Sequence, residues 1–418
     1  MPASPTTARL IDYAHRLFWP GLAVYVFTLP ISHSIAVRNA AFVMLIVATL
    51  LLSIGLREKP TLPLPGAWAA YAGIALISCL YAISPRESLG EIRVEIFYCI
   101  VIFAIAVTWA KNSDLLSAFA LIAAASNLIL VVIALSVAGF DKSWEYILTL
   151  PGWARAGLNA NYLLTMAPFL GYTAWALWCQ GKRPLAAGLA LLLLLDVLAM
   201  MVSLNRQALL ALAAGIFCAG ALLLKGRFTW RRAAIFFGTL FLLAGLLAAQ
   251  MIHRAATTGG TVGAVDQAAQ TAVARDVRWS LWKFSLEKIG EHPLAGGGFG
   301  RAVFDKLYPD FMPEDILLWH AHNMVLNKGI QMGIPGMLAF LLLWYALLRA
   351  FTQHLRGAAR ERAMAIAGIA TLATIFVKNM TDDFFVRDMA LWFWLVTGVL
   401  LGSLQRQEAA APALPAPR

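Results

Sequence analysis

Long apolar segments recur along almost the whole chain, and they constrain its fold more than any other feature. A helix that crosses a bilayer needs about 20 consecutive, mostly apolar residues. The sequence predicts twelve such segments, at residues 18–37, 40–56, 66–83, 92–110, 115–138, 161–179, 184–203, 208–224, 233–252, 324–349, 363–379 and 389–404. Because the apolar runs are continuous rather than alternating, they predict helices and exclude a porin-type barrel.

The composition agrees with a membrane protein. Of the 418 residues, 61% are hydrophobic and 13% are charged, whereas a soluble domain carries roughly 25% charged residues. The mean hydropathy is +0.73. The four cysteines lie inside apolar runs without CxxC spacing, which argues against a disulfide framework or a zinc site. The expected fold is therefore all-α, a polytopic membrane protein with twelve transmembrane helices.

The basic residues predict how these helices are oriented. The net charge is +11, from 33 Lys and Arg against 22 Asp and Glu. The excess gathers in every second connection, for example at Lys182 and Arg183 and at Arg231 and Arg232. Because short, positively charged loops face the cytoplasm, both termini are expected there. The charge thus predicts topology rather than a nucleic-acid partner, and no cleaved signal peptide is expected.

One connection is much longer than the others. Residues 253–322 separate the ninth and tenth apolar segments on the predicted outer side, and long ordered loops are commonly functional. The expected organisation is nine helices over 1–252, a loop subdomain over 253–322, three helices over 323–404 and a disordered cytoplasmic tail over 405–418.

Within this loop, residues 272–289 predict an amphipathic helix. Apolar residues recur at spacings of three and four, as one buried helix face requires: Val273, Val277, Leu281 and Phe284. The opposite face carries Arg275, Arg278 and Trp282. Two interpretations stay open. The helix can rest on lipid headgroups, or its two arginines can form a fork for a phosphate or pyrophosphate.

A glycine-rich stretch follows at Gly296, Gly297, Gly298 and Gly300. It lacks the context of strand, glycine loop and helix that a phosphate cradle requires. We expect a flexible turn.

The strongest local pattern is WHAHNMVLNKGIQMGIPG, residues 319–336. His320 and His322 stand at the outer mouth of the tenth apolar segment, followed by Asn323. A metal site is disfavoured, because an HxH pair without a third spaced ligand is weak evidence. A helix cap or a headgroup contact stays open. A neutral imidazole at this boundary is also suited to accept a proton from a hydroxyl group near neutral pH.

Charged residues in or near the apolar segments need partners, because an unpaired charge at that depth is costly. Arg206 lies between the seventh and eighth segments. Either a salt bridge to Asp196 or an anionic substrate can satisfy it. Glu95 and Asp196 are expected to be structural partners.

The motif around His322 resembles that of a known family. His322-Asn323, nine residues, then Gly333-x-x-Gly336 match the H-[N/S/Q]-x9-G-x-x-G pattern of bacterial O-antigen ligases. These belong to a superfamily with O-antigen polymerases and O-linked oligosaccharyltransferases. The resemblance covers the whole chain, since the twelve segments, the large outer loop and the arginines after the seventh segment and on the loop helix all agree.

The resemblance implies a GT-C-like glycosyltransferase architecture in the bacterial inner membrane, with a periplasmic active site. The donor would be O-antigen polysaccharide on undecaprenyl pyrophosphate, and the acceptor a sugar hydroxyl of lipid A–core. His322 would be the general base, while Arg206 and either Arg278 or Arg275 would bind the pyrophosphate. Further substrate contacts are expected from Arg275, Trp282, His320, Asn323 and Lys328.

The resemblance also implies inverting transfer without metal, nucleotide or other cofactor, because the glycosyl pyrophosphate is already activated and arginines can take the role of a cation. Two alternatives within the superfamily are an O-antigen polymerase and a protein O-oligosaccharyltransferase. A transporter of lipid-linked saccharides is an alternative of another class. It is disfavoured because few polar residues run through the apolar segments.

Overall fold

The computed structural model describes most of the chain. The described residues are 5–31, 34–140, 156–202, 206–225, 229–257, 277–311, 320–381, 383, 385 and 387–410.

Every regular element in these residues is helical, which confirms the predicted all-α fold. The α-helices are α1 (Pro5–Thr28), α2 (Ile35–Leu56), α3 (Pro65–Ser78), α4 (Pro85–Ile92), α5 (Tyr98–Asn112), α6 (Leu115–Phe140), α7 (Ala156–Cys179), α8 (Arg183–Val202), α9 (Arg206–Leu224), α10 (Trp230–Thr257), α12 (Val277–Glu291), α13 (Val303–Leu307), α14 (Met324–Thr352), α15 (Ala359–Met380) and α16 (Arg387–Ala410). Shorter turns are the π-helical η1 (Arg93–Phe97) and the 3-10 turns η4 (Pro309–Phe311) and η5 (Gln353–Arg356).

Each predicted apolar segment falls on a helix, and eight helical stretches of the described chain are long and apolar enough to cross a membrane. They are Ile35–Leu56, Pro85–Asn112, Leu115–Leu135, Arg183–Met201, Gln207–Leu224, Met324–Arg356, Ala359–Met380 and Arg387–Ala409. The chain is thus a polytopic membrane protein. The count of twelve stays a prediction, since α3, for example, has only 14 residues.

Several predicted boundaries differ from the structure, for example those of the first segment and of the tail. The first segment was expected to reach residue 37, but α1 ends at Thr28, because Pro30 cannot continue the helical hydrogen bonds. The tail was expected to be disordered from residue 405, but α16 continues to Ala410 through residues that favour helix, such as Glu408.

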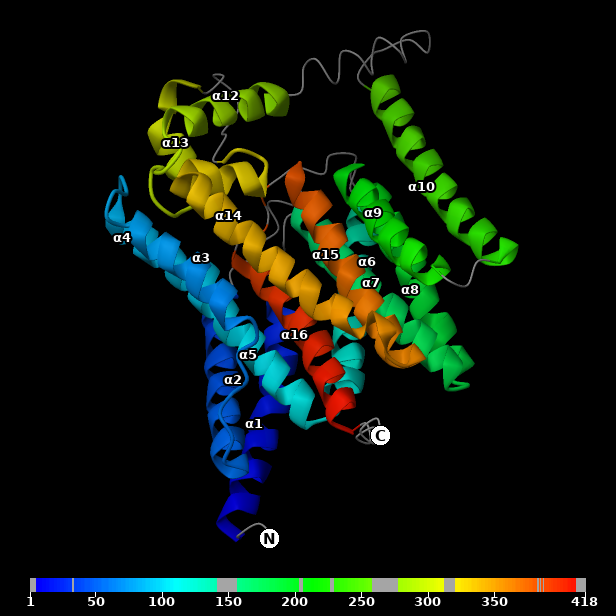
Figure 1. The fold of residues 1–418 in the computed structure, drawn as a ribbon. Helices are drawn as coiled ribbons and strands as arrows, with labels where there is room; N and C mark the ends of the chain where they lie inside the picture. The colour runs from blue at the N-terminus through cyan, green and yellow to red at the C-terminus, as the bar shows by residue number, and fades with distance from the viewer. Residues whose placement is uncertain are drawn as a thin grey trace, which may run out of the picture.

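Helix α16 lies at the centre of the bundle, between α5 and α15 (Figure 1). Two of its glycines allow close contact with α5. A Cβ at Gly398 would lie 2.7 Å from the Cβ of Ala106, and one at Gly402 would lie 2.6 Å from the carbonyl oxygen of Val107. Small residues four apart let two membrane helices approach backbone to backbone.

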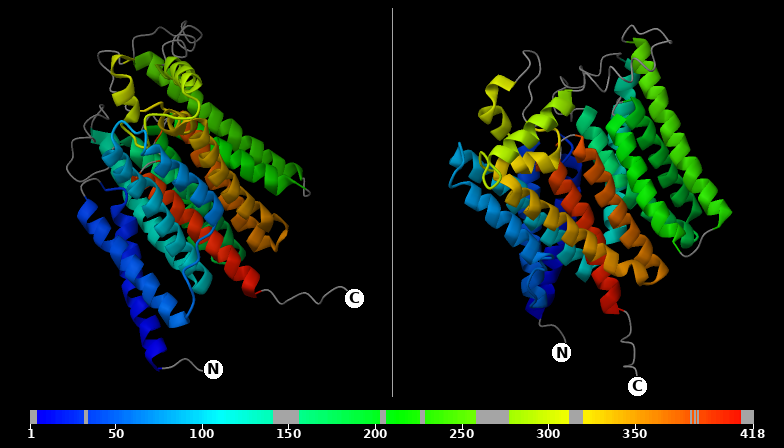
Figure 2. Two further views of the ribbon diagram at one scale, coloured as in Figure 1. Left: turned by 60° about the vertical axis from the view of Figure 1, so that its left-hand side comes forward. Right: turned by 45° about the horizontal axis from the view of Figure 1, so that its top comes forward.

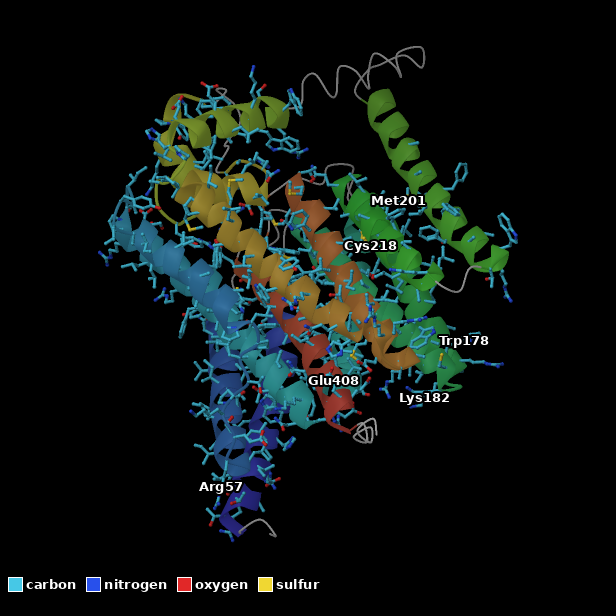
Figure 3. All side chains as sticks on the ribbon, viewed as in Figure 1. Arg57, Trp178, Lys182, Met201, Cys218 and Glu408 are labelled. Carbon is cyan, nitrogen blue, oxygen red and sulfur yellow. The ribbon has the colours of Figure 1, made fainter. Side chains whose placement is uncertain are left out.

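The two ends of the bundle differ. Helix α1 begins and α16 ends on one side, whereas α12 and α13 cover the start of α14 on the other (Figures 1 and 2). Arg57 and Lys182, both predicted to be cytoplasmic, lie on the side away from α12 (Figure 3). This arrangement agrees with the predicted separation between a basic side and an outer side that carries the loop helix.

Candidate active site

Asn323 fixes the start of α14. Its Oδ1 accepts hydrogen bonds from the backbone N–H groups of Val325 at 3.0 Å and Leu326 at 3.1 Å, which makes it the N-cap of the helix. Its Nδ2 donates to the carbonyl oxygen of Met380, at the end of α15, at 3.0 Å. Asn323 was predicted to bind substrate. In the described residues Oδ1 caps α14 and Nδ2 joins α14 to α15, while the contact with substrate stays a prediction.

His322 directly precedes this cap and has an unusual backbone. Its φ is +46°, in the left-handed region that side chains rarely adopt, so surrounding contacts must hold it there. Its N–H donates to Nδ1 of His320 at 3.1 Å, and its carbonyl oxygen accepts a long hydrogen bond from Nε1 of Trp282 at 3.4 Å. The structure therefore brings together three predicted site residues, two from the histidine motif and one from the loop helix.

The two imidazoles have different environments. His320 is buried, with 4% of its surface exposed, and its Nδ1 accepts a hydrogen bond, so that nitrogen carries no proton. His322 is half-buried, and its ring centre lies 4.3 Å from that of His320. His320 thus helps to hold the main chain of His322, while the ring of His322 is the more accessible of the two.

Helix α12 carries Arg278, one of the predicted arginines, and lies against α14. It packs on α14 through a buried stripe of Leu281, Ser285 and Ile289. The fit is close, because a Cβ at Gly329 of α14 would lie 2.4 Å from Cδ1 of Ile289. Residues four apart share a helix face. Half-buried Arg278 therefore lies one turn before Trp282, on the face that contacts His322.

The predicted apolar face of α12 is confirmed in part. Leu281 is buried, and Phe284 packs beside Phe304 in a small core with α13. Val273, Arg275 and the side chain of Val277 lie outside the described residues. The helix packs on protein along its buried stripe, so a helix that only rests on lipid does not account for its position.

Gly333 interrupts α14 in the middle of the family motif. Its φ of +69° and ψ of −168° are open essentially to glycine alone. The interruption leaves the carbonyl group of Ile330 without a partner inside the helix. The carbonyl group of Gln331 also lacks a helical partner, because the residue four positions later is Pro335, which has no N–H. Freed backbone groups at membrane depth must find partners within the protein.

The glycine-rich stretch provides these partners. The N–H of Gly297 donates to the carbonyl oxygen of Ile330 at 3.0 Å, and the N–H of Gly298 donates to that of Gln331 at 2.9 Å. In return the N–H of Ile334 donates to the carbonyl oxygen of Pro293 at 2.8 Å. The expectation of a flexible turn was wrong. These glycines are largely buried, and a Cβ at Gly296 would lie 2.2 Å from the carbonyl oxygen of Ile330, whereas one at Gly298 would lie 2.3 Å from the Cβ of Ala82.

The same stretch is also attached to the end of α3. The carbonyl oxygen of Gly297 accepts from the N–H of Ile83 at 2.9 Å, and the N–H of Phe299 donates to Oγ of Ser78 at 3.0 Å. Gly296–Gly300, which we call the glycine strap, thus ties the outer loop to both α3 and α14. The strap thus fixes the part of the loop that directly follows α12.

We predict that Gly333→Ala destabilises the protein. A residue forced into this backbone region costs about 1–3 kcal/mol, and the new Cβ would also lie 2.7 Å from the carbonyl oxygen of Pro293. Thermal unfolding in detergent should show a clearly lowered midpoint. Gly290→Ala on α12 is the matched control, since a Cβ there has no neighbour within 4 Å. Equal midpoints for both variants would contradict the role assigned to Gly333.

Lys328 lies in a buried polar cluster below the histidines. Its Nζ is 3.5 Å from Oε2 of Glu95 and 3.1 Å from Oε1 of Gln331, and it lies 4.4 Å from the ring centre of Phe299 in the glycine strap. Gln331 in turn donates to the carbonyl oxygen of Gly300 at 2.8 Å. Glu95 is a structural partner, as predicted. Lys328, with 3% exposure, joins η1, the strap and α14, and its predicted contact with substrate stays a prediction.

Asp196, the other predicted structural partner, pairs with an uncharged amide. Both carboxylate oxygens of Asp196 accept from Nδ2 of Asn127, at 3.0 and 2.9 Å, so an amide on α6 is its partner in the described chain. Arg206 is the first residue of α9, but its side chain lies outside the described residues. The adjacent Gln207 accepts from Nζ of the fully buried Lys378 at 3.2 Å, which fixes the start of α9 against α15.

Comparison with known proteins relates part of the chain to a protein family. Residues 189–341 match the family model described as O-antigen ligase. The comparison with curated proteins found no match. The matched segment spans Arg206, helix α12 with Arg278, and the motif from His322 to Gly336, so it contains every candidate site residue.

The match over residues 189–341 and the multi-pass helical fold therefore agree with the motif, and together they support an O-antigen ligase-family protein, a glycosyltransferase-like membrane enzyme of the superfamily that acts on lipid-linked polysaccharides.

Proposed function

We propose that this protein is an O-antigen ligase of the bacterial inner membrane. It transfers polysaccharide from undecaprenyl pyrophosphate to a sugar hydroxyl of lipid A–core on the periplasmic face, with both termini in the cytoplasm. The observation that carries the proposal is the placement of His322. Its imidazole stands at the start of α14, and Trp282 joins its main chain to the helix that carries Arg278.

The proposed chemistry follows from these groups. A sugar hydroxyl becomes a better nucleophile as it loses its proton, and an accessible imidazole can accept that proton. His322 is the more exposed of the two imidazoles, while His320 uses Nδ1 to hold the chain. A single displacement at the anomeric carbon breaks the bond to the pyrophosphate oxygen and inverts the configuration. The proton passes from the acceptor hydroxyl to His322.

The leaving pyrophosphate gains negative charge as its bond to the sugar breaks. Arginines are always charged, and their planar forks match phosphate oxygens, so they stabilise that charge selectively. Arg278, one turn before Trp282 on α12, is proposed as one of these cations. Arg206, at the start of α9, and Arg275 are proposed as the other cations. Outer-loop residues 253–322 are proposed as the subdomain that positions the donor.

The lipopolysaccharide profile of a deletion strain tests this function. A ligase deletion leaves free lipid A–core and accumulates long lipid-linked polymer, and plasmid-borne wild type restores the ladder. Core that carries a single repeat unit would indicate a polymerase instead. An unchanged profile with loss of sugar from a secreted protein would indicate a protein O-oligosaccharyltransferase.

We predict that transfer does not require a divalent cation. Three arginines can match the two to three negative charges of a pyrophosphate, and the chain contains no DxD pair that would hold a metal for the donor. Asp383, one of the outer acids, is buried and accepts a hydrogen bond from Asn327. Purified protein should keep its activity in EDTA. Loss of activity that magnesium or manganese restores would overturn this mechanism.

A further inference from the structure

Three potential metal ligands meet at the end of the bundle opposite the histidine motif. His354 belongs to η5, which follows α14, while Glu361 lies in the first turn of α15 and Glu408 in the last turns of α16. Helix α14 has 29 residues, which at about 1.5 Å per residue separates the cluster from His322 by roughly 40 Å. Figure 3 shows Glu408 near the end of α16, on the side where Arg57 and Lys182 also lie.

The distances between these side chains suit a shared ion. Nδ1 of His354 lies 2.9 Å from Oε1 of Glu361 and 3.3 Å from Oε1 of Glu408, and the three ligand atoms lie within 4.8 Å of one another. Zinc binds nitrogen and oxygen ligands at about 2.0–2.2 Å. Neighbouring ligands of one such ion are therefore about 3.0–3.6 Å apart. The edge from His354 to Glu408 lies in this range, the edge to Glu361 is slightly shorter, and the third needs only a small movement of exposed Glu408.

The carboxylate of Glu361 occupies the space beside Gly357. A Cβ at Gly357 would lie 2.1 Å from Oε2 of Glu361, so any larger residue would displace this carboxylate. The backbone of Gly357 has a φ of −70°, which every residue type can adopt. Glycine thus leaves space for this carboxylate, and a larger residue would require the carboxylate to move. His354, with 5% exposure, is held just as firmly, so two of the three ligands are preorganised.

One hydrogen bond from His354 cannot satisfy both carboxylates of this cluster. Nδ1 of His354 can carry one hydrogen, yet two carboxylates lie within 3.3 Å of it. Two nearby arginines have other partners: Arg406 lies 3.8 Å from Asp114, and Arg360 forms a hydrogen bond with Tyr172. A divalent cation would bind the nitrogen and both carboxylates together and would cancel their two negative charges.

We propose that His354, Glu361 and Glu408 form a binding site for a divalent transition metal of the zinc type. One imidazole and two carboxylates favour such ions over magnesium or calcium, which prefer oxygen ligands alone. The bound ion fastens the end of the central helix α16 to the turn between α14 and α15. It is separate from the transfer reaction, so the site contributes to stability and leaves catalysis unchanged.

Metal binding to the full-length protein in lipid nanodiscs, after removal of any affinity tag, tests this site. We expect one Zn²⁺ per chain by calorimetry, a higher unfolding midpoint with Zn²⁺, and visible absorption when Co²⁺ is the probe. Glu408→Gln changes an exposed residue and should fold normally, yet it should weaken Zn²⁺ binding by at least about 10-fold. His354→Gln should abolish binding. Glu58→Gln, an exposed acid outside the cluster, is the control.

Several results would overturn the proposal. Wild-type protein that binds no Zn²⁺ at one per chain would show that the cluster is only an ion pair. The same conclusion would follow if Glu408→Gln lowered the unfolding midpoint equally with and without Zn²⁺. Equal Zn²⁺ binding by wild type and both cluster variants would place the metal elsewhere.

Discussion

His322→Ala is expected to lower the rate of transfer by about 10²–10⁴-fold, the usual contribution of a general base. The loss should fall on kcat, because the imidazole acts on the proton of the acceptor hydroxyl rather than on donor binding. The fold should persist, since the ring is half-buried and the cap at Asn323 holds the start of α14 without it. Transfer by purified protein, with expression and unfolding midpoint measured in parallel, checks this result.

His320→Ala is the matched comparison. His320 accepts the N–H of His322 through Nδ1, so its loss relaxes the main chain but leaves the reactive imidazole in place. We expect a smaller decrease in rate, together with a lowered unfolding midpoint because the side chain is buried. If His320 proved essential and His322 dispensable, the assignment of the base would be reversed.

Arg206→Ala and Arg278→Ala should each lower kcat by about 10²–10³-fold, the cost of removing one group that stabilises developing negative charge. Lysine at either position keeps the charge but lacks the planar fork that binds two phosphate oxygens, so it should restore little activity. We expect Arg275→Ala to have a smaller effect than Arg278→Ala, because Arg278 is one turn from the Trp282 contact with His322.

Lys283→Ala is the control for the arginine series. Lys283 is an exposed cation on the same helix, and it faces away from Arg278. Its loss should leave kcat unchanged. Full activity in Arg206→Lys and Arg278→Lys would show that a point charge or a structural ion pair suffices, and the proposed pyrophosphate fork would be wrong.

The local patterns of the sequence predicted much of this architecture. Continuous apolar runs placed all twelve segments on helices, because membrane helices satisfy their own backbone hydrogen bonds. The histidine motif was correctly placed at the mouth of α14. The cap formed by Asn323 could also have been found, because asparagine directly before an apolar helix is a strong N-cap signal.

Contacts between distant segments were less predictable. The glycine strap was taken for a flexible turn, because its partners, the carbonyl groups freed at Gly333, arise only when α14 is interrupted. The pairing of Lys328 with Glu95 was not predicted, because Glu95 lies far away in the sequence and η1 meets α14 only in the folded bundle. The local spacing of residues in the sequence predicts neither contact.

The most direct test of the central claim follows both products of one reaction. Purified protein in nanodiscs receives undecaprenyl-pyrophosphate-linked polysaccharide and lipid A–core, and both free undecaprenyl pyrophosphate and core-linked polysaccharide are measured. Wild type should form them in equal amounts, and His322→Ala should form both at least about 100-fold more slowly. Release of undecaprenyl pyrophosphate with longer lipid-linked polymer, and no sugar on the core, would contradict the claim.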